Sequence, residues 1–137
     1  MTGTVTGAPK ALLRLEGLFV LIAACAAYAR IGGDWWLFAV LFLAPDLSML
    51  GYLAGRWAGA SLYNLAHWYL IPLAAIGWGV FGQNALTLDI GLIWGAHIGF
   101  DRALGYGLKY ADSFGATHLG VKGKAAKAAK CQTAEAV

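Results

Sequence analysis

Four long apolar runs constrain the fold of this chain most strongly. They cover residues 12–30, 35–54, 58–81 and 85–104, and only short polar stretches separate them. A helix of ~20 residues rises about 1.5 Å per residue and so crosses the ~30 Å hydrocarbon core of a bilayer. Only 12% of the residues are charged, whereas soluble domains have about a quarter. The sequence therefore predicts an all-α, four-helix transmembrane bundle with up-down topology.

The segments that flank the four runs indicate its orientation. Residues 1–11 are small and polar and are expected to be disordered, residues 12–110 form the predicted transmembrane domain, and residues 111–137 form a polar, basic tail. With four spans both termini share one side, and that side holds every Lys and Arg residue except Arg30. The positive-inside rule therefore predicts that both termini are cytoplasmic.

The net charge of +3 does not indicate a nucleic-acid-binding protein. No basic stripe alternates with exposed aromatic residues, as a nucleic-acid interface would require. The tail lysines lie in an Ala-rich segment: Lys122, Lys124, Lys127 and Lys130. Such a basic segment beside a membrane is typical of contact with anionic lipid. The lipid bilayer is therefore the predicted partner, and nucleic acid is not.

Two prolines lie inside the apolar runs, Pro45 in the second and Pro72 in the third. A proline in a helix removes one backbone donor and clashes with the carbonyl four residues earlier. The affected carbonyls are those of Leu41 and Trp68, which then need another donor. The second and third spans are therefore predicted to bend or break near these prolines.

Six polar residues interrupt the runs and are predicted to line one pocket: Glu16, Asp46, Asn64, His67, His97 and Asp101. Measured from the midpoint of each run, Asp46, His67 and His97 lie about 2–4 Å to the cytoplasmic side of the midplane. Glu16 and Asn64 lie about 7 Å to the same side. An unpaired charge at this depth costs about 2.5–3.5 kcal/mol even on insertion scales. A shared layer across four helices therefore favours one common site.

Asp101 lies about 10 Å from the midplane, one helical turn beyond His97, so these two side chains share a helical face. Imidazoles combined with carboxylates suit a divalent transition metal, and His67, His97 and Asp101 are its predicted ligands. The same groups can instead relay a proton or hold another cation or a small solute. No HExxH, CxxC or paired Glu-x-x-His motif occurs to decide between these alternatives.

The primary functional prediction is a membrane protein whose pocket binds or relays a proton, a cation or a small solute. One alternative is an intramembrane metal-dependent enzyme that also uses Asp46. Another is an accessory subunit that packs against a membrane partner subunit through glycines spaced four apart, at residues 51, 55 and 59 and at residues 91, 95 and 99. Four helices are few for a complete transport path, so a transporter would be a homodimer.

Several motifs together resemble a known family. They are Arg14-Leu15-Glu16, APDLSMLGYLAG at residues 44–55, YNLAHWYLIP at residues 63–72, and AHIGFDRALGYGLKY followed by FGATHLG within residues 96–120. From residue 12 to residue 120 the chain resembles small bacterial membrane proteins filed as a domain of unknown function, number four-two-six-zero. The resemblance implies a four-helix protein of the bacterial inner membrane. It implies no activity and transfers no catalytic or binding residues.

Overall fold

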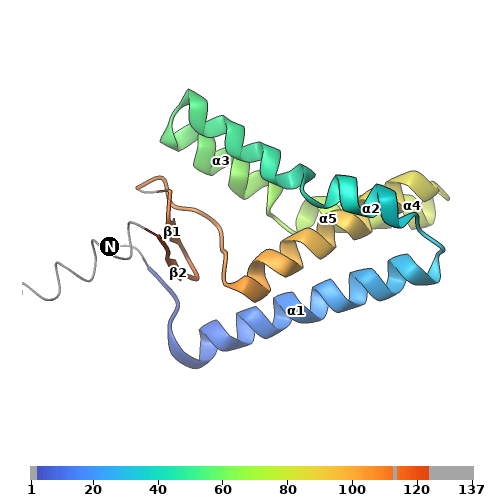
Figure 1. Ribbon diagram of the computed structural model, residues 1–137, viewed down its shortest axis with the longest axis horizontal. Helices are drawn as coiled ribbons and strands as arrows, with labels where there is room; N and C mark the ends of the chain where they lie inside the picture. The colour runs from blue at the N-terminus through green and yellow to red at the C-terminus, as the bar shows by residue number, and fades with distance from the viewer. Residues whose placement is uncertain (1–2, 113, 124–137) are drawn as a thin grey trace, which may run out of the picture.

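The computed structural model describes residues 3–112 and 114–123, and most of them are helical (Figure 1). In chain order the elements are α1 (Gly7–Arg30), α2 (Trp35–Phe42), the 3₁₀ helix η1 (Ala44–Ala54), α3 (Arg56–Ala66), α4 (Leu70–Phe81), α5 (Ala85–Leu104), β1 (Ala116–Thr117) and β2 (Gly120–Val121). All four apolar runs are helical. Two stretches, Gly7–Arg30 and Trp35–Ala54, are each long and apolar enough to cross a membrane.

The first helix starts earlier than the sequence predicts. Disorder is expected through residue 11, but α1 begins at Gly7. Pro9 is compatible with this start because it lies in the first turn, where an N–H has no partner within the helix. Just before the helix, the Val5 N–H donates to the His118 carbonyl at 2.8 Å. This bond ties the start of the chain to the segment that follows α5.

The second and third runs are both interrupted, as their prolines predict. The second run changes from α to 3₁₀ geometry at Ala44, next to Pro45. The third run is interrupted at residues 67–69, so its break precedes Pro72, which lies in the first turn of α4. Broken helices at membrane depth occur where the irregular backbone faces protein or a cavity. Both interruptions here face α5, through Asp46 and His67.

The carbonyls expected to be free at these interruptions have backbone partners. The Trp68 carbonyl accepts the Ile71 N–H at 3.3 Å, and the Leu41 carbonyl accepts the N–H of the residue two positions later. Side chains of α5 instead serve the last carbonyls of α3. Trp94 Nε1 donates to the Ala66 carbonyl at 2.7 Å, and Arg102 supplies the neighbouring carbonyl, as described below.

The 3₁₀ helix and α3 form a hairpin whose turn is the single residue Gly55, at φ 126°. Only glycine adopts this conformation without strain. A Cβ on Gly51 would lie 2.7 Å from Leu62 Cδ1, and a Cβ on Gly59 would meet the Tyr52 ring. The first set of spaced glycines therefore serves packing within this hairpin.

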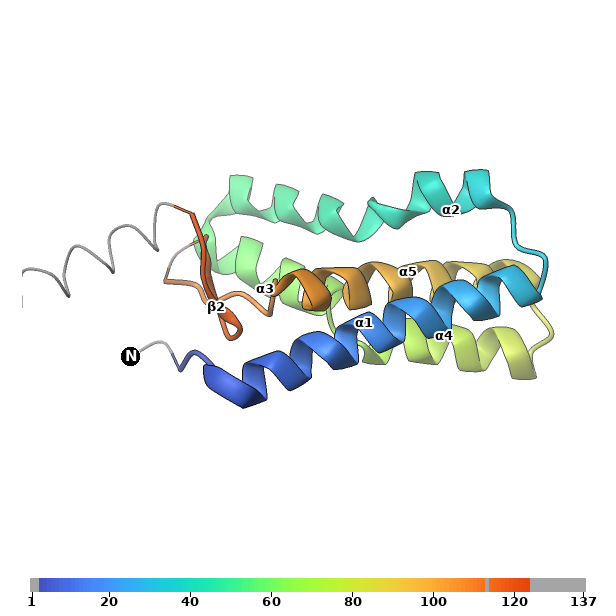
Figure 2. The same ribbon diagram turned by 60° about the horizontal axis from the view of Figure 1, so that its bottom comes forward.

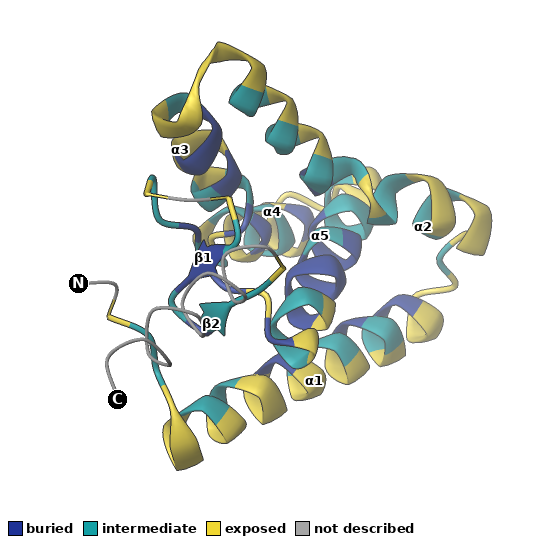
Figure 3. Ribbon diagram, turned by 60° about the vertical axis from the view of Figure 1, so that its left-hand side comes forward, coloured by how far each residue is buried: buried dark blue, intermediate teal, exposed yellow. Residues whose placement is uncertain are grey.

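Helix α5 is the central element of the fold. It lies between α1 and the α2–η1 segment, with α4 also alongside (Figures 1 and 2). Figure 3 shows it as the most continuously buried helix. Asn84 starts it, because its Oδ1 accepts the Thr87 N–H at 2.9 Å, and Gly105 ends it in the left-handed region at φ 84°. The polar residues of the last run are therefore carried into the interior.

The residues after α5 do not form an extended tail throughout. Strands β1 and β2 pair as an antiparallel hairpin, and Lys109 bridges to Thr117. Leu119 in its turn is fully buried. Part of the predicted polar tail over residues 111–137 therefore forms a hairpin with a buried apolar side chain. The remainder of the predicted tail lies outside the described residues.

The glycines of α5 allow a matched test of this packing. A Cβ on Gly99 would lie 2.7 Å from both Gly17 O and Leu21 N, whereas a Cβ on Gly95 would meet only Pro72 Cβ at 4.0 Å. We predict that Gly99→Ala destabilises the protein by about 1–3 kcal/mol, because overpacking forces the backbones of α1 and α5 apart. Gly95→Ala is the control and should be close to neutral. Thermal unfolding in detergent, followed by Trp fluorescence, measures both; equal effects would contradict the packing described.

Candidate metal centre

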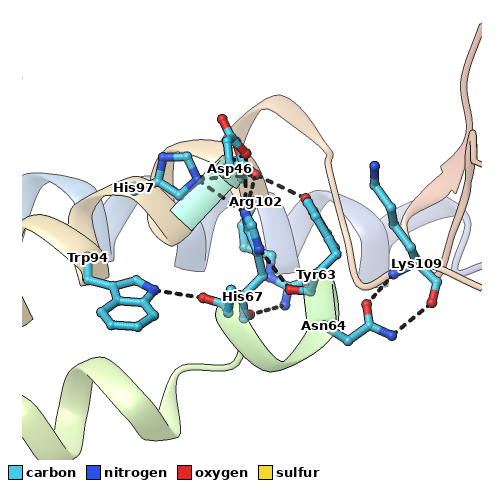
Figure 4. Close-up of polar contacts among 10 residues, drawn as sticks. Asp46, Tyr63, Asn64, His67, Trp94, His97, Arg102 and Lys109 are labelled. Carbon is cyan, nitrogen blue, oxygen red and sulfur yellow. Dashed lines mark hydrogen bonds and ion pairs between the residues drawn. The ribbon is translucent and has the colours of Figure 1, made fainter. Parts of the chain in front are cut away.

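Four side chains from three separate helical segments converge on one point inside the bundle: Asp46, His67, His97 and Asp101. One ligand atom from each lies within 4.8 Å of all the others. Figure 4 shows His67 and His97 turned toward Asp46, with Arg102 and Tyr63 beside them. All three predicted metal ligands, His67, His97 and Asp101, belong to this group, and Asp46 completes it.

Five of the six separations among these atoms are close to the edges of a coordination tetrahedron. The two Nε2 atoms are 3.2 Å apart. His67 Nε2 lies 3.6 Å from Asp46 Oδ1 and 3.4 Å from Asp101 Oδ2, and His97 Nε2 lies 3.6 and 3.8 Å from the same oxygens. A tetrahedral ion with bonds of 2.0–2.1 Å has ligand atoms roughly 3.3–3.4 Å apart. The group is therefore close to the size that a four-coordinate metal requires.

Each ligand is brought to this point by its place in a helix. Asp46 lies in the first turn of η1, and His67 is the residue at which α3 ends. On α5, Asp101 follows His97 by one turn, and helical side chains lean toward the N-terminus of their helix. The Asp101 carboxylate thus reaches back to the level of His97 although its backbone lies closer to the end of α5.

The hydrogen bonds of His67 fix its tautomer. Its Nδ1 lies 2.9 Å from the Tyr63 carbonyl, which can only accept, so in the neutral ring Nδ1 carries the proton. Its Nε2 then presents a lone pair to the centre of the group. Tyr63 also stacks on the His67 ring, with centroids 3.7 Å apart, and donates its hydroxyl to Asp101 Oδ2 at 3.2 Å. One tyrosine therefore orients two of the ligands, as supporting residues do in metal sites.

The site is closed at the two histidines and open at Asp46. The side chains of His67 and His97 are 3% and 1% exposed, and that of Asp101 is 15% exposed, whereas that of Asp46 is 40% exposed. His97 Nδ1 is buried and makes no hydrogen bond to the described residues. An ion at this position would be held from inside by imidazoles and approached past Asp46.

Two other residues of the predicted pocket do not belong to the four. Glu16 is exposed on α1. Asn64 turns to the chain after α5, where its Oδ1 accepts the Lys109 N–H at 2.6 Å and its Nδ2 donates to the Lys109 carbonyl at 2.9 Å. Through these two hydrogen bonds, Asn64 holds the segment after α5 against α3.

Arg102 and Lys109 are two basic residues near the centre that the sequence assigns only to the cytoplasmic side. Arg102 Nη2 donates to the His67 carbonyl at 3.3 Å. Lys109 is 8% exposed, and its Nζ lies 4.3 Å from the centroid of the Tyr63 ring and 3.7 Å from that of Phe114. Burial lowers the pKa of Lys109 from its ordinary value. Figure 4 shows Lys109 on the side of Tyr63 away from His67.

Tyr63 is the supporting residue that sequence reasoning missed, although a signal for it exists. It precedes His67 by four residues, as His97 precedes Asp101, so each pair shares a helical face. Considering the residues on both helical faces together would have included Tyr63 in the predicted site. No comparable spacing signals Lys109, because it follows α5 in irregular chain.

An apolar cavity of about 270 Å³ is lined by residues that neighbour these ligands in the chain. It is lined by Leu41, Ala44, Pro45, Ser48, Ala66, Ile90, Ile93 and Trp94. Pro45 and Ala66 directly precede two of the ligands, and Ile93 lies one turn before His97. The Ser48 hydroxyl is buried and has no hydrogen-bond partner among the described residues.

Comparison with known proteins shows the family of this chain. A family described as Domain of unknown function (DUF4260) matches residues 10–121. The chain belongs to the DUF4260 family. All four converging residues of this DUF4260 chain lie within the matched region. No curated protein and no solved structure matches it.

Proposed function

We propose that this DUF4260 protein binds one divalent transition-metal ion through Asp46, His67, His97 and Asp101, within a multi-pass membrane domain. The carrying observation is the convergence of two imidazole nitrogens and two carboxylate oxygens at near-tetrahedral separations. Ligand sets of this kind hold zinc and related ions.

The protonation of the two histidines supports a cation at this point. His67 Nε2 is an acceptor, and the two carboxylate oxygens around it are acceptors as well. In the protein without an ion, one proton on His97 Nε2 relieves this conflict by donating to His67 Nε2 at 3.2 Å. A metal ion would take the place of that proton, which a neutral His97 ring can carry on Nδ1 instead, and would satisfy all four groups together.

The donor types favour a transition metal over calcium or magnesium. Ca²⁺ takes six to eight oxygen ligands, and Mg²⁺ keeps several waters in an octahedral shell. This group offers only two carboxylates, and half of its donors are imidazole nitrogens. Imidazole suits Zn²⁺, Fe²⁺ and Ni²⁺.

A metal-dependent enzyme is the second candidate, favoured by one observation. The group is open at Asp46, and residues next to Asp46 and His67 in the chain line the apolar cavity of about 270 Å³. A structural metal site is closed, whereas a catalytic one keeps a position for water or substrate. The cavity would admit an apolar molecule whose polar end reaches the ion.

The exterior supports placement of the domain in the bacterial inner membrane. Large apolar side chains stay exposed at several helices, with Trp36 at 82%, Leu53 at 88% and Phe81 at 90%. Surfaces of this kind are expected to face lipid. Among the described residues, the basic side chains other than Arg30 gather at one end, where Arg56 donates to the Asp112 carbonyl and Arg14 to the Ala103 carbonyl. The positive-inside rule then makes this end, with both termini, cytoplasmic.

Metal content tests the primary proposal. We predict that the purified full chain binds one Zn²⁺ or Co²⁺ ion, and that His67→Ala and His97→Ala each lower the affinity at least about tenfold. His118→Ala is the matched control, because its Nδ1 accepts the Leu108 N–H instead and lies outside the group. Elemental analysis and competition titration provide the measurement. Binding should weaken as the pH falls, because protons compete with the metal for the ligand atoms. Equal affinities in all four proteins would refute the site.

Terminal reporters test the membrane placement. We predict that a fluorescent protein fused to either terminus is active in the cytoplasm, and that a cysteine placed at Ile31 is labelled from the periplasmic side. Ile31 suits this because it is 48% exposed and its φ of −84° is open to any residue. A periplasmic terminus would overturn the topology without affecting the metal proposal.

The cobalt form tests the second candidate. We predict that octanohydroxamate changes the visible spectrum of the Co²⁺-loaded protein at lower concentration than acetohydroxamate, because its chain enters the cavity. Ser48→Leu fills that cavity and should remove the preference for the longer chain. If neither hydroxamate alters the spectrum of a protein that does hold Co²⁺, the site is closed and the enzymatic candidate fails alone.

A further inference from the structure

A group of basic residues surrounds the C-terminal end of α5, outside the metal centre. Arg14 Nε donates to the Ala103 carbonyl and Lys122 Nζ donates to the Leu104 carbonyl, both at 2.8 Å. These two cationic groups flank the same glycine, since a Cβ on Gly105 would lie 3.7 Å from one and 3.9 Å from the other. Two parts of the chain that are distant in sequence thus bring positive charge to the same end of α5.

Lys10 joins the same group from one turn earlier on α1. It precedes Arg14 by four residues and so shares its helical face, and its Nζ lies 3.0 Å from where a Cβ on Gly120 would be. Burial and the nearby charges of Arg14 and Lys10 lower the pKa of Lys122. Among residues 3–112 and 114–123, no carboxylate lies within salt-bridge distance of Lys10, Arg14 or Lys122. The carbonyls at the end of α5 accept hydrogen bonds from Arg14 and Lys122 but carry no negative charge that would neutralise them.

An apolar groove continues from the basic group along α1. It has a volume of about 360 Å³ and is lined by Ala11, Arg14, Leu15, Leu18 and Ala103. The four α1 residues follow helical spacing and form one face. From Lys10 to Leu18 this face extends about 12 Å along the helix axis, so it leads away from the charged end of the bundle along its outer surface. Arg14 belongs to both the basic group and the groove.

We propose that this surface binds one anionic phospholipid, with its phosphate at Lys10, Arg14 and Lys122 and an acyl chain in the groove between α1 and α5. The arrangement has the polarity that a lipid of the cytoplasmic leaflet requires: charge at the predicted cytoplasmic end and apolar surface deeper. A lysine or arginine near the surface favours anionic lipid, and the groove offers the chain a place that a soluble phosphate would not use. The proposal rests on the membrane placement above and is independent of the metal.

Native mass spectrometry of the full chain, released from detergent after incubation with phosphatidylglycerol or phosphatidylcholine of equal chain length, tests it. The wild-type protein should bind phosphatidylglycerol about tenfold more tightly or better. K10Q/R14Q/K122Q should lose this preference. K124Q/K127Q/K130Q removes the same number of charges from the tail and should keep it. Preference that follows the tail lysines, or no preference in the wild type, overturns the proposal.

Two further variants keep the test decisive if the triple substitution disturbs folding. Lys10→Glu leaves both bonds to the α5 carbonyls in place and should still reduce phosphatidylglycerol binding severalfold. Ala11→Trp fills the groove and keeps all the charges. It should weaken the binding of phosphatidylglycerol but not the binding of soluble glycerol phosphate. If glycerol phosphate displaces the lipid at equal concentration, or if Ala11→Trp has no effect, the surface is an anion site without lipid recognition, and the proposal fails.

Discussion

The hydrogen bonds that α3 loses where it ends have to be made by other groups, and much of the interior is arranged around the side chains that make them. Trp94 serves the Ala66 carbonyl and Arg102 serves the His67 carbonyl. Both donors come from α5, the helix that also carries His97 and Asp101. Because unsatisfied backbone groups are expensive away from water, the position of His67 at the break is set by the same helix that supplies half of the proposed metal ligands. The end of α3 and the proposed metal site therefore depend on the same helix, α5.

Packing of the helices around the site explains how four groups that all act as hydrogen-bond acceptors can lie so close together. Two carboxylates and two imidazoles repel or compete when only acceptors face one another, yet the surrounding helices hold them within a few ångströms. The Gly17–Gly99 approach fixes α1 against α5, and the Gly55 hairpin brings η1 and α3 in as a unit. Ligand positions fixed by packing are the condition for a preorganised ion site. Tyr63 adds local control, because it touches one histidine through its ring and one aspartate through its hydroxyl.

The position of each residue along its helix could be predicted from the sequence, but rotation about each helix axis could not. Helical rise gives this position directly, and it placed Asp46, His67, His97 and Asp101 in one predicted layer. Glu16 has a suitable depth but is exposed on α1, and Asn64 turns to the Lys109 backbone. A side chain's direction depends on which neighbour its helix packs against, which apolar runs do not reveal. The hairpin after α5 could not be predicted from the sequence for another reason. Its strands have two residues each, too few for any periodic signal.

The burial of Lys109 behind Tyr63 has a consequence for what accompanies an ion into the bundle. With Asp46 and Asp101 ionised, Arg102 and a protonated Lys109 bring the local sum of charges to zero before any ion arrives. A divalent ion would then leave this weakly polar region with two surplus positive charges. Such a surplus is costly unless protons depart or an anion enters. Electroneutrality thus favours arrival of the metal together with a negatively charged companion, and the half-exposed side at Asp46 is where that companion would have room.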